Sequence, residues 1–345
     1  MKADGIRRKP KRRAEPSDSR FEGYASGQPV SIVIPSLDDR DLLKKHLPPL
    51  LDEVVRRGGG DEILVVDDTG KGTLAAWLAS RFPDVRALAR GDNGGFAKAL
   101  YDGVESAAHD LVFAMNPDIL VHEGFLDPLI AELTDPQVHS VVPRILLFGN
   151  PDEVESLTEI AVEFEMAYVR QQGLEGRDLS ELWKAPFPVN YGVGGALLMR
   201  RQEFLDGGGF DRLYEPFYYE DVDLGFAAWR SGRRVLLVPD AIVEHHHRGS
   251  IGKRVDAEVV RAVIERNRYL FHWKFLDDPE DVERHLAALE RQALDAYLRD
   301  ERAELVWLTL ALERLEELQR SRSRLGAGER SFEQVCRESA PQRNV

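Results

Sequence analysis

Short apolar runs alternate with stretches of helical periodicity along the first half of the chain. Strand-like runs lie at residues 31–34, 62–66, 85–89, 111–115 and 140–144. Helix-like stretches separate them, at residues 42–55, 74–82, 96–107 and 125–133. Strands joined through helices form right-handed units, whose parallel sheet is covered by helices on both faces. The sequence therefore predicts an α/β fold with a mostly parallel sheet, whose ligands bind at the carboxyl ends of the strands.

The pattern is less regular after the fifth strand-like run. We make no assignment for residues 149–184, and we expect Pro239 to close a strand at residues 235–238. Helices are expected at residues 224–230, 259–276, 282–298 and 305–318. The chain should thus comprise a disordered basic tail (1–28), a catalytic α/β domain (29–254) and a C-terminal helical region (255–345).

Charge and composition restrict the partners and the compartment. The 345 residues have a formal net charge of -14, which argues against nucleic-acid binding because phosphate backbones require clustered Lys and Arg. The single cysteine, Cys336, excludes an internal disulfide and suits a reducing compartment. The longest apolar stretch near the C-terminus, residues 305–312, is too short to span a bilayer. We expect a cytoplasmic protein, and contact with the inner face of the membrane stays open.

Two acidic clusters follow apolar or aromatic segments about a hundred residues apart. The first is Asn-Pro-Asp at residues 116–118, and the second is Glu-Asp-Val-Asp at residues 220–223. Carboxylates placed just past a buried strand can share a divalent cation with a phosphate group. The two clusters therefore indicate metal-assisted chemistry on a nucleotide.

Eight short motifs lie in one order between residues 30 and 275. They are Ser31-Ile-Val-Ile-Pro35, Val65-Val-Asp-Asp68, Asn93-Gly-Gly-Phe96, Met115-Asn-Pro-Asp118, Gly194-Gly-Ala196, Gly208-Gly-Phe-Asp211, Glu220-Asp-Val-Asp-Leu224, and Pro239-Asp-Ala241 with His245. Together they resemble the family 2 inverting glycosyltransferases, particularly the rhamnosyltransferase-like branch. The resemblance implies a GT-A fold, which is a Rossmann-like, mostly parallel sheet flanked by helices, here with a C-terminal helical appendage. It also implies a nucleotide-sugar donor and Mg²⁺ or Mn²⁺.

The resemblance implies donor-binding residues at the strand ends and in the loop before residue 96. Asp67 resembles the acid that bonds the base or ribose, and a strand-end turn is its structural alternative. Asn93 and Gly94 open a helix whose free N–H groups favour an anion, although Asn93 could equally be an ordinary N-cap. Five further residues are implied at the donor site: Pro35, Asp38, Lys98, Asn116 and Gly195.

The same resemblance divides the acidic clusters between a metal and a proton. Asp118 and His245 would bind the cation, and the donor diphosphate would supply much of the coordination because a single carboxylate makes a weak site. Asp221 would be the general base that takes the proton of the acceptor hydroxyl. Glu220 would orient Asp221 or bind the acceptor sugar, as would Asp223. Capping of the following helix is the structural alternative, and it suits Asp223 best.

The donor and acceptor are expected only by class. A dTDP-linked rhamnose stands first, with UDP-linked hexoses as alternatives, and the acceptor is a glycan or a lipid-linked saccharide. The basic and aromatic segment at residues 266–274 predicts either an interfacial membrane helix or packing on the catalytic domain. Homo-oligomerisation through the later Leu-rich helices also stays open.

Two other classes of function are compatible with a related sheet. A sugar-1-phosphate nucleotidyltransferase would need a Gly-rich basic loop after the first strand, where this sequence reads Pro35-Ser-Leu-Asp38. A non-catalytic scaffold would not need Asp118 and Asp221. The glycosyltransferase interpretation is favoured because it uses both acidic clusters.

Overall fold

The fold is built around one ten-stranded sheet. A computed structural model describes residues 27–171, 181–246, 255–326 and 328–340, so most of the predicted basic tail lies outside the described residues. The strands follow the order β10-β12-β6-β11-β4-β1-β2-β3, with β5 and β7 paired off this path. Four strands of one half pair in parallel: β1 (Val30–Ser36), β2 (Glu62–Asp67), β3 (Arg86–Ala89) and β4 (Leu111–Met115).

Three helices join these four strands, as the alternating pattern predicts. They are α1 (Arg40–Arg57), α2 (Thr73–Arg81) and α3 (Gly95–Ser106). The residues of β1 and β4 are buried along their whole length, which explains why both read as continuous apolar runs. Gly103 lets α3 approach the sheet closely, because a Cβ there would overlap Val33 and lie 2.7 Å from Val66. The parallel half of the sheet therefore agrees with the sequence prediction.

The other half of the sheet is mixed. β11 (Ala196–Arg200) runs antiparallel between β4 and β6 (Val138–Leu147), and β12 (Arg234–His245) runs parallel to β6. The prediction that Pro239 closes a strand is wrong, because β12 continues past it. A break in the β6–β12 register between Val238 and Ile242 accommodates the proline, which cannot donate a ladder hydrogen bond. The remaining strands of this sheet are short: β5 (Ile119–Val121), β7 (Asn150–Val154) and β10 (Phe187–Pro188).

The segment left unassigned from the sequence contains a separate hairpin. β8 (Thr158–Glu163) and β9 (Met166–Gln171) pair with each other in antiparallel fashion. Of the short helices of the chain, η2 (Leu182–Lys184) ends this segment, and α4 (Leu126–Glu132), α5 (Arg201–Asp206) and η3 (Arg212–Tyr214) lie before or after it. The helix α6 (Glu220–Arg230) begins four residues earlier than predicted, so the second acidic cluster forms its first turn.

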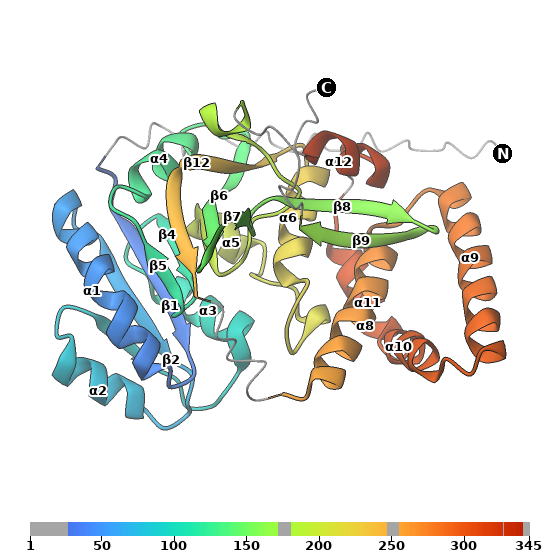
Figure 1. Cartoon of the computed structure of the whole chain (residues 1–345), viewed down its shortest axis with the longest axis horizontal. Coiled ribbons are helices and arrows are strands. Elements are labelled where there is room, and N and C mark those ends of the chain that lie inside the picture. The colour runs from blue at the N-terminus through green and yellow to red at the C-terminus, as the bar shows by residue number, and fades with distance from the viewer. Residues whose placement is uncertain (1–26, 172–180, 247–254, 327, 341–345) are drawn as a thin grey trace, which may run out of the picture.

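The C-terminal helices lie at the opposite end of the molecule from α1 and α2 (Figure 1). They are α8 (Ala257–Phe275), α9 (Pro279–Leu298), α10 (Arg302–Leu312), α11 (Leu315–Arg324) and α12 (Phe332–Ser339). The helix predicted at residues 305–318 is thus two helices, which meet at residues 313–314. Among the described helices, none combines the length and apolarity that crossing a membrane would require.

The segment at residues 266–274 is part of the core. Tyr269, Leu270 and Phe271 are at most 1 % exposed, and the ring of Phe271 lies edge-on to that of Phe226 in α6. An interfacial helix would expose these aromatic side chains to lipid. These three side chains therefore pack on the catalytic part of the chain, as the alternative predicted, and contact of the protein with a membrane stays a prediction.

Candidate active site

The two acidic clusters are connected through the loop at Gly194 and Gly195. The N–H of Asn116 donates to the carbonyl of Gly195 (2.8 Å), and the N–H of Gly194 donates to Oδ2 of Asp221 (2.9 Å). Gly195 leaves no room for a side chain, since a Cβ there would lie 2.7 Å from Cγ of Asn116, and a Cβ on Gly194 would lie 3.2 Å from Cβ of Asp221. Two segments separated by a hundred residues are thereby brought to the same edge of the sheet.

Asp221 and Glu220 are neighbouring carboxyl groups in the partly buried first turn of α6. Burial raises the pKa of Asp221, and the N–H groups of Gly194 and Val222 oppose that effect. Burial, together with the charge of Asp221, raises the pKa of Glu220 to about 8. Two adjacent carboxyl groups in a partly desolvated site do not ionise together readily. The pair can therefore hold one carboxylate beside one protonated acid near neutral pH.

Asp118 and His245 are brought together by strand pairing. Ile119 of β5 pairs with His245 of β12, which places Nε2 of His245 3.2 Å from Oδ1 of Asp118. The other ring nitrogen, Nδ1, donates to Oε2 of Glu155 at 2.5 Å. Burial works to lower the pKa of His245, but hydrogen bonds and charges of Asp118 and Glu155 raise it to about 9. His245 is thus held between two carboxylates.

The chemistry of this donor set fits a divalent cation with few protein ligands. Oδ1 of Asp118 is buried and, apart from the contact with His245, has no hydrogen bond in the described part of the chain. Metal-binding histidines commonly donate their second ring N–H to a carboxylate, as His245 does to Glu155. No group of three or more His, Cys, Asp or Glu side chains among the described residues could hold a metal. A cation here would need oxygen ligands from a bound molecule.

Asp223 has a structural environment. Its carboxylate accepts hydrogen bonds from the hydroxyl of Tyr214 (2.7 Å) and from Nζ of Lys274 (2.8 Å), and it is 5 % exposed. Lys274 also pairs with the partly buried Asp211 (2.9 Å), so that one lysine of α8 joins two acids. An acceptor sugar could bond Asp223 only by displacing these partners. These contacts are structural, but they are not the helix cap expected from the sequence, because the carboxylate bonds the side chains of Tyr214 and Lys274 and α6 has no side-chain cap hydrogen bond. Contact of Asp223 with an acceptor stays a prediction.

Asp67 lies at the carboxyl end of β2, where it organises the turn into α2. Oδ1 accepts from the N–H and hydroxyl of Thr69, and Oδ2 accepts from the N–H groups of Leu74 and Ala75 (both 2.9 Å). Burial works to raise the pKa of Asp67, but these hydrogen bonds lower it overall. The carboxylate is 0 % exposed, so a nucleotide that bonded it would have to displace part of this turn.

The adjacent Asp68, which sequence reasoning passed over, reaches the loop before α3. It accepts from the N–H groups of Gly94 (3.0 Å) and Gly95 (2.9 Å), and it pairs with Arg90. An anion at this helix start would compete with a carboxylate that is already present. The pair Asp67-Asp68 after a buried strand indicates that one of the two carboxylates lies at the donor site. The sequence does not show which of the two points at the loop before α3.

The other predicted donor residues surround this edge of the sheet. Pro35 lies in β1 opposite Val66, and Asp38 lies in the turn after β1 with a positive φ of 65°. Asn93 and Lys98 are exposed, and Oδ1 of Asn93 accepts from the N–H of Gly95 (3.1 Å), which leaves its amide NH₂ outside this bond. The open side of this edge therefore offers a basic and an amide side chain.

Glu155 and His46 support the predicted metal ligands and were missed from the sequence. Glu155 lies between β7 and β8, ninety residues from the histidine that it contacts, and nothing local marks it. The ring Nδ1 of His46 donates to the carbonyl of Pro117 (2.8 Å) and so holds the turn before Asp118. Apolar spacing along α1 identified the buried face to which His46 belongs, but not its partner.

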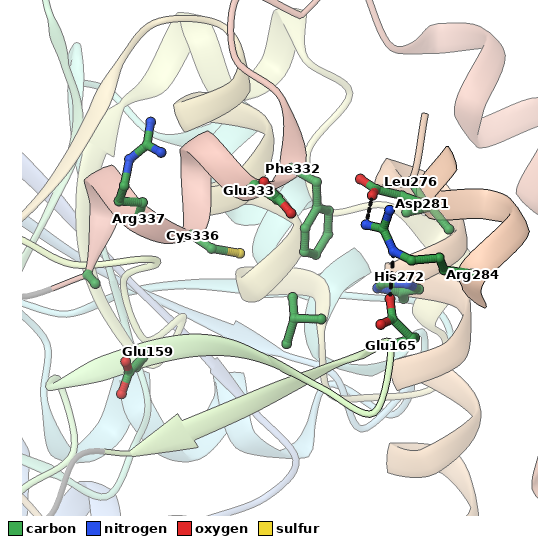
Figure 2. Close-up of a pocket in the computed structure, with 12 residues that line it drawn as sticks. Glu159, Glu165, His272, Leu276, Asp281, Arg284, Phe332, Glu333, Cys336 and Arg337 are labelled. Carbon is green, nitrogen blue, oxygen red and sulfur yellow. Dashed lines mark hydrogen bonds and ion pairs between the residues drawn. The ribbon is translucent and has the colours of Figure 1, made fainter. Parts of the chain in front are cut away.

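A separate pocket of about 530 Å³ lies between the β8–β9 hairpin, the α8–α9 junction and α12 (Figure 2). Leu276 and Phe332 contribute apolar surface, and Arg284 pairs with Glu165 and Asp281 at its rim. The residues that line it include neither acidic cluster and none of the donor candidates. It is therefore distinct from the site formed by Asp118, Asp221 and the glycine loop.

The sequence is similar to those of known glycosyltransferases. Residues 31–202 match the family model described as Glycosyl transferase family 2. The N-acetylglucosaminyl-diphospho-decaprenol L-rhamnosyltransferase of Mycobacterium tuberculosis (strain ATCC 25618 / H37Rv) is 27% identical over 228 residues, which are 61% of this chain and 73% of that protein. The pre-mycofactocin glycosyltransferase of the same strain is 27% identical over 231 residues, which are 65% of this chain but only 44% of that protein.

A solved structure extends the comparison to the fold. The crystal structure of GalNAc-T7 with UDP, GalNAc and Mn2+ superposes with a TM-score of 0.57 at 18% identity, covering 73% of this chain and 48% of that chain. At this identity the likeness concerns the fold alone. The predicted GT-A fold is confirmed.

Proposed function

Since the chain belongs to glycosyltransferase family 2, we propose that it transfers a hexose from a nucleoside diphosphate sugar to a saccharide hydroxyl with inversion of configuration. Rhamnose from a dTDP-linked donor is our first choice, because a rhamnosyltransferase is among the relatives of this chain. That relative's name includes a diphospho-decaprenol acceptor, and we propose a lipid-linked saccharide as the acceptor here.

One observation carries this proposal, namely the loop that connects the acidic clusters. Asn116 is bonded to Gly195 and Asp221 is bonded to Gly194, so the two clusters flank two consecutive residues. In-line displacement at a sugar carbon needs groups on opposite sides of that carbon, one for the leaving diphosphate and one for the incoming hydroxyl. The two clusters are suited to these two tasks.

In the proposed reaction Asp221 is the base. Its carboxylate takes the proton of the acceptor hydroxyl as that oxygen bonds to the anomeric carbon, and the bond to the diphosphate oxygen breaks with its electron pair on the diphosphate. The bond from Gly194 fixes one oxygen of Asp221 and leaves the carboxylate oriented. The raised pKa of Asp221 makes it a stronger base than an ordinary aspartate. Glu220, as the protonated neighbour, can donate a hydrogen bond to the acceptor sugar.

Asp118 and His245 would hold Mg²⁺ or Mn²⁺, with Glu155 orienting the imidazole. When bound, such a cation neutralises negative charge that develops on a leaving diphosphate. Asn93, Gly94 and Lys98, with Pro35, Asp38 and Asp67 at neighbouring strand ends, are our candidates for contacts with the nucleotide and diphosphate. We retain as a proposal the division into a catalytic domain at residues 29–254 and a helical region at residues 255–345. Residues of α8 are buried against the catalytic part of the chain, so the two regions share a core.

A donor panel tests the proposal. Nucleoside diphosphate release should be measured for dTDP- and UDP-linked sugars with Mn²⁺ and lipid-extract acceptors, in the wild type and in Asp221→Asn. We expect release from one donor, and a loss on the order of 10² or more in turnover by Asp221→Asn with unchanged nucleotide affinity. Full activity of Asp221→Asn would exclude Asp221 as the base, and a product with the same anomeric configuration as its donor would exclude inversion.

The alternatives predict different products. A nucleotidyltransferase would form a nucleotide sugar and pyrophosphate from a sugar 1-phosphate and a nucleoside triphosphate, but the turn after β1 contains Asp38 and Asp39 instead of a basic glycine loop. A scaffold would release no nucleotide from any donor. The family match and the partly buried acid pair both favour catalysis over a scaffold.

A further inference from the structure

The loop that precedes the proposed base has a strained backbone. Tyr218 and Tyr219 have φ angles of 68° and 79°, in the left-handed region that large side chains seldom adopt. Residues held in this region are unfavourable on their own and persist only where surrounding contacts impose them. Tyr219 is also the N-cap of α6 and provides no side-chain cap. Something outside the loop must therefore hold it in place before Glu220 and Asp221.

Asn267 of α8 provides that contact. Its side chain is 0 % exposed, and its Nδ2 lies within hydrogen-bonding distance of three loop carbonyls, those of Tyr214 (2.9 Å), Phe217 (3.0 Å) and Tyr218 (2.8 Å). An amide has only two N–H hydrogens, so at least one of them is shared between two carbonyls. A single side chain of the C-terminal helices thus bonds the loop at both of its ends.

The neighbouring arginines orient this amide and bond the middle of the loop. Nε and Nη2 of Arg266 donate to Oδ1 of Asn267 (3.0 and 2.8 Å), which directs the NH₂ group of Asn267 toward the loop. Nη2 of Arg266 also donates to the carbonyl of Glu215 (2.6 Å), and Arg314, the N-cap residue of α11, reaches the same carbonyl (3.3 Å). Four of the five backbone carbonyls from residue 214 to residue 218 are therefore bonded by side chains of α8 and of this N-cap residue.

Aromatic packing directs the same loop onto α8. The ring centroid of Tyr219 lies 5.8 Å from that of Phe271 and 6.4 Å from that of Tyr214. On the far side, Asp221 is bonded to Gly194. The segment from Tyr214 to Asp221 is thus held between the C-terminal helices and the glycine loop.

We propose that Asn267 is a positioning residue for the transfer reaction, which holds the strained Tyr218–Tyr219 turn and thereby fixes the orientation of Glu220 and Asp221. This inference rests on the proposed function, since it gives the loop a role only if Asp221 is the base. It makes the C-terminal helices part of the catalytic unit and no longer an appendage. Loss of the Asn267 bonds relaxes the turn, so Asp221 shifts away from the acceptor hydroxyl and gains water.

The test compares Asn267→Ala with wild type in three measurements. In steady-state kinetics with the donor found active in the panel, kcat should fall on the order of 10-fold or more while KM for the donor changes less than about threefold. The acid limb of the kcat profile should move to lower pH, because hydration removes part of the burial that raises the pKa of Asp221. Hydrogen exchange should accelerate in residues 214–222 and stay unchanged in residues 62–82.

Asn190→Ala is the matched control. Asn190 is equally buried, and its amide bonds the N–H of Ile160 and the hydroxyl of Ser339, neither of which belongs to residues 214–221. Its loss should lower the Tm to a similar extent without moving the acid limb. If Asn267→Ala does not fold, Arg266→Met provides the test, because it removes the guanidinium that orients the amide and retains an apolar stem. Its effects should be smaller and in the same direction.

The results separate this inference from the proposed function. Suppose that the wild type catalyses transfer and that Asn267→Ala leaves kcat and the acid limb unchanged. This result would overturn the positioning role and leave the proposed function intact, and the same holds for Arg266→Met if Asn267→Ala fails to fold. Absence of transfer by the wild type with every donor would overturn the proposed function itself. A shift of the acid limb in Asn190→Ala as large as that in Asn267→Ala would also overturn the inference, since general loosening would then suffice.

Discussion

The N–H of Gly194 donates to Oδ2 of Asp221 at 2.9 Å, across twenty-seven residues of chain. The bond has two consequences for the proposed base. It gives the carboxylate one fixed direction, and it partly opposes the effect of burial on the pKa of Asp221. The next residue, Gly195, contacts Asn116 of the first acidic cluster, so the position of the base and that of the predicted metal motif depend on one short loop.

Gly194→Ala should therefore reduce activity by displacing Asp221. The new Cβ would lie 3.2 Å from Cβ of Asp221 and 3.4 Å from Cζ of Phe210, so the acid must shift by a few tenths of an ångström. We expect kcat to fall about 10-fold, because small displacements of a reacting group are costly. Gly326→Ala is the control, since a Cβ there meets nothing within 4 Å. Equal activity of the two variants would show that the site tolerates this displacement.

Glu220→Gln should stabilise the protein at alkaline pH. Oε2 of Glu220 is buried and has no hydrogen-bond partner among the described residues, and the pKa of Glu220 is raised to about 8. In the unfolded chain the same carboxyl group has a pKa near 4.3, so it ionises at a lower pH there than in the folded protein. The free energy of unfolding of the wild type therefore falls as the pH rises from about 4 to 8. The variant avoids this loss. We expect a gain of about 1–3 kcal/mol in the free energy of unfolding at pH 9, and almost none at pH 4.

Urea unfolding at both pH values measures this difference. A gain that is the same at pH 4 and pH 9 would mean that the ionisation of Glu220 is not its origin. The gain should accompany reduced activity, because groups placed for chemistry are often unfavourable for stability.

The sequence predicted the part of the fold that depends on local patterns. Continuous apolar runs such as that of β4 identify strands buried on both faces, and the 3.6-residue spacing identified the helices between them. Pro239 misled the prediction because a proline breaks a strand unless the ladder contains an irregularity, and that irregularity depends on the partner strand β6. The β8–β9 hairpin carries many polar residues, and its alternation was too weak to distinguish from a loop.

The candidate site divides in the same way. Asp118, Asp221 and His245 belong to short motifs and could be proposed from the sequence. Glu155 and Asn267 have no motif of their own, because their roles arise from contacts across ninety residues to His245 and forty-nine residues to Tyr218. Asp223 was proposed for the acceptor, and only its contact with Lys274 revealed a structural environment.

Lys274→Met should strongly destabilise the protein. Lys274 lies between Asp211 and Asp223, and its removal leaves one buried and one partly buried acid without their shared cation. Breaking one side of a buried ion pair typically costs about 3–5 kcal/mol. Thermal and urea unfolding at pH 7 measure the loss. Lys184→Met is the control, since the Lys184–Glu181 pair is exposed and worth less than about 1 kcal/mol.

Acid should weaken the same cluster in the wild type. Burial works to raise the pKa of Asp211, but the charge and hydrogen bond of Lys274, with hydrogen bonds from Ser321 and Leu213, hold it well below its ordinary value. Stability from such a carboxylate is present above the unfolded pKa of about 3.9 and is lost as the pH falls toward the folded pKa. We expect the Tm to fall steeply below pH 4, and less steeply in Lys274→Met. Equal slopes for the two proteins would contradict this origin.

Metal affinity should depend on a residue outside the proposed pair of ligands, namely Glu155. Asp118 and His245 are two protein ligands, and the described residues contain no larger cluster, so Mn²⁺ alone should bind weakly. Addition of UDP or dTDP should tighten Mn²⁺ binding at least about 10-fold, because the diphosphate supplies oxygen ligands. Glu155 holds the second ring nitrogen of His245 at 2.5 Å, and removal of such a partner typically lowers metal affinity about 10- to 100-fold. Glu155→Gln should therefore weaken Mn²⁺ binding in the presence of nucleotide by about that factor, measured by calorimetry, while Asp118→Asn should weaken it further.

Glu153→Gln is the control, since Glu153 lies two residues away and bonds only Asn150 among the described residues. Tight Mn²⁺ binding without nucleotide, or unchanged affinity in Glu155→Gln, would show that the cation is held by other groups.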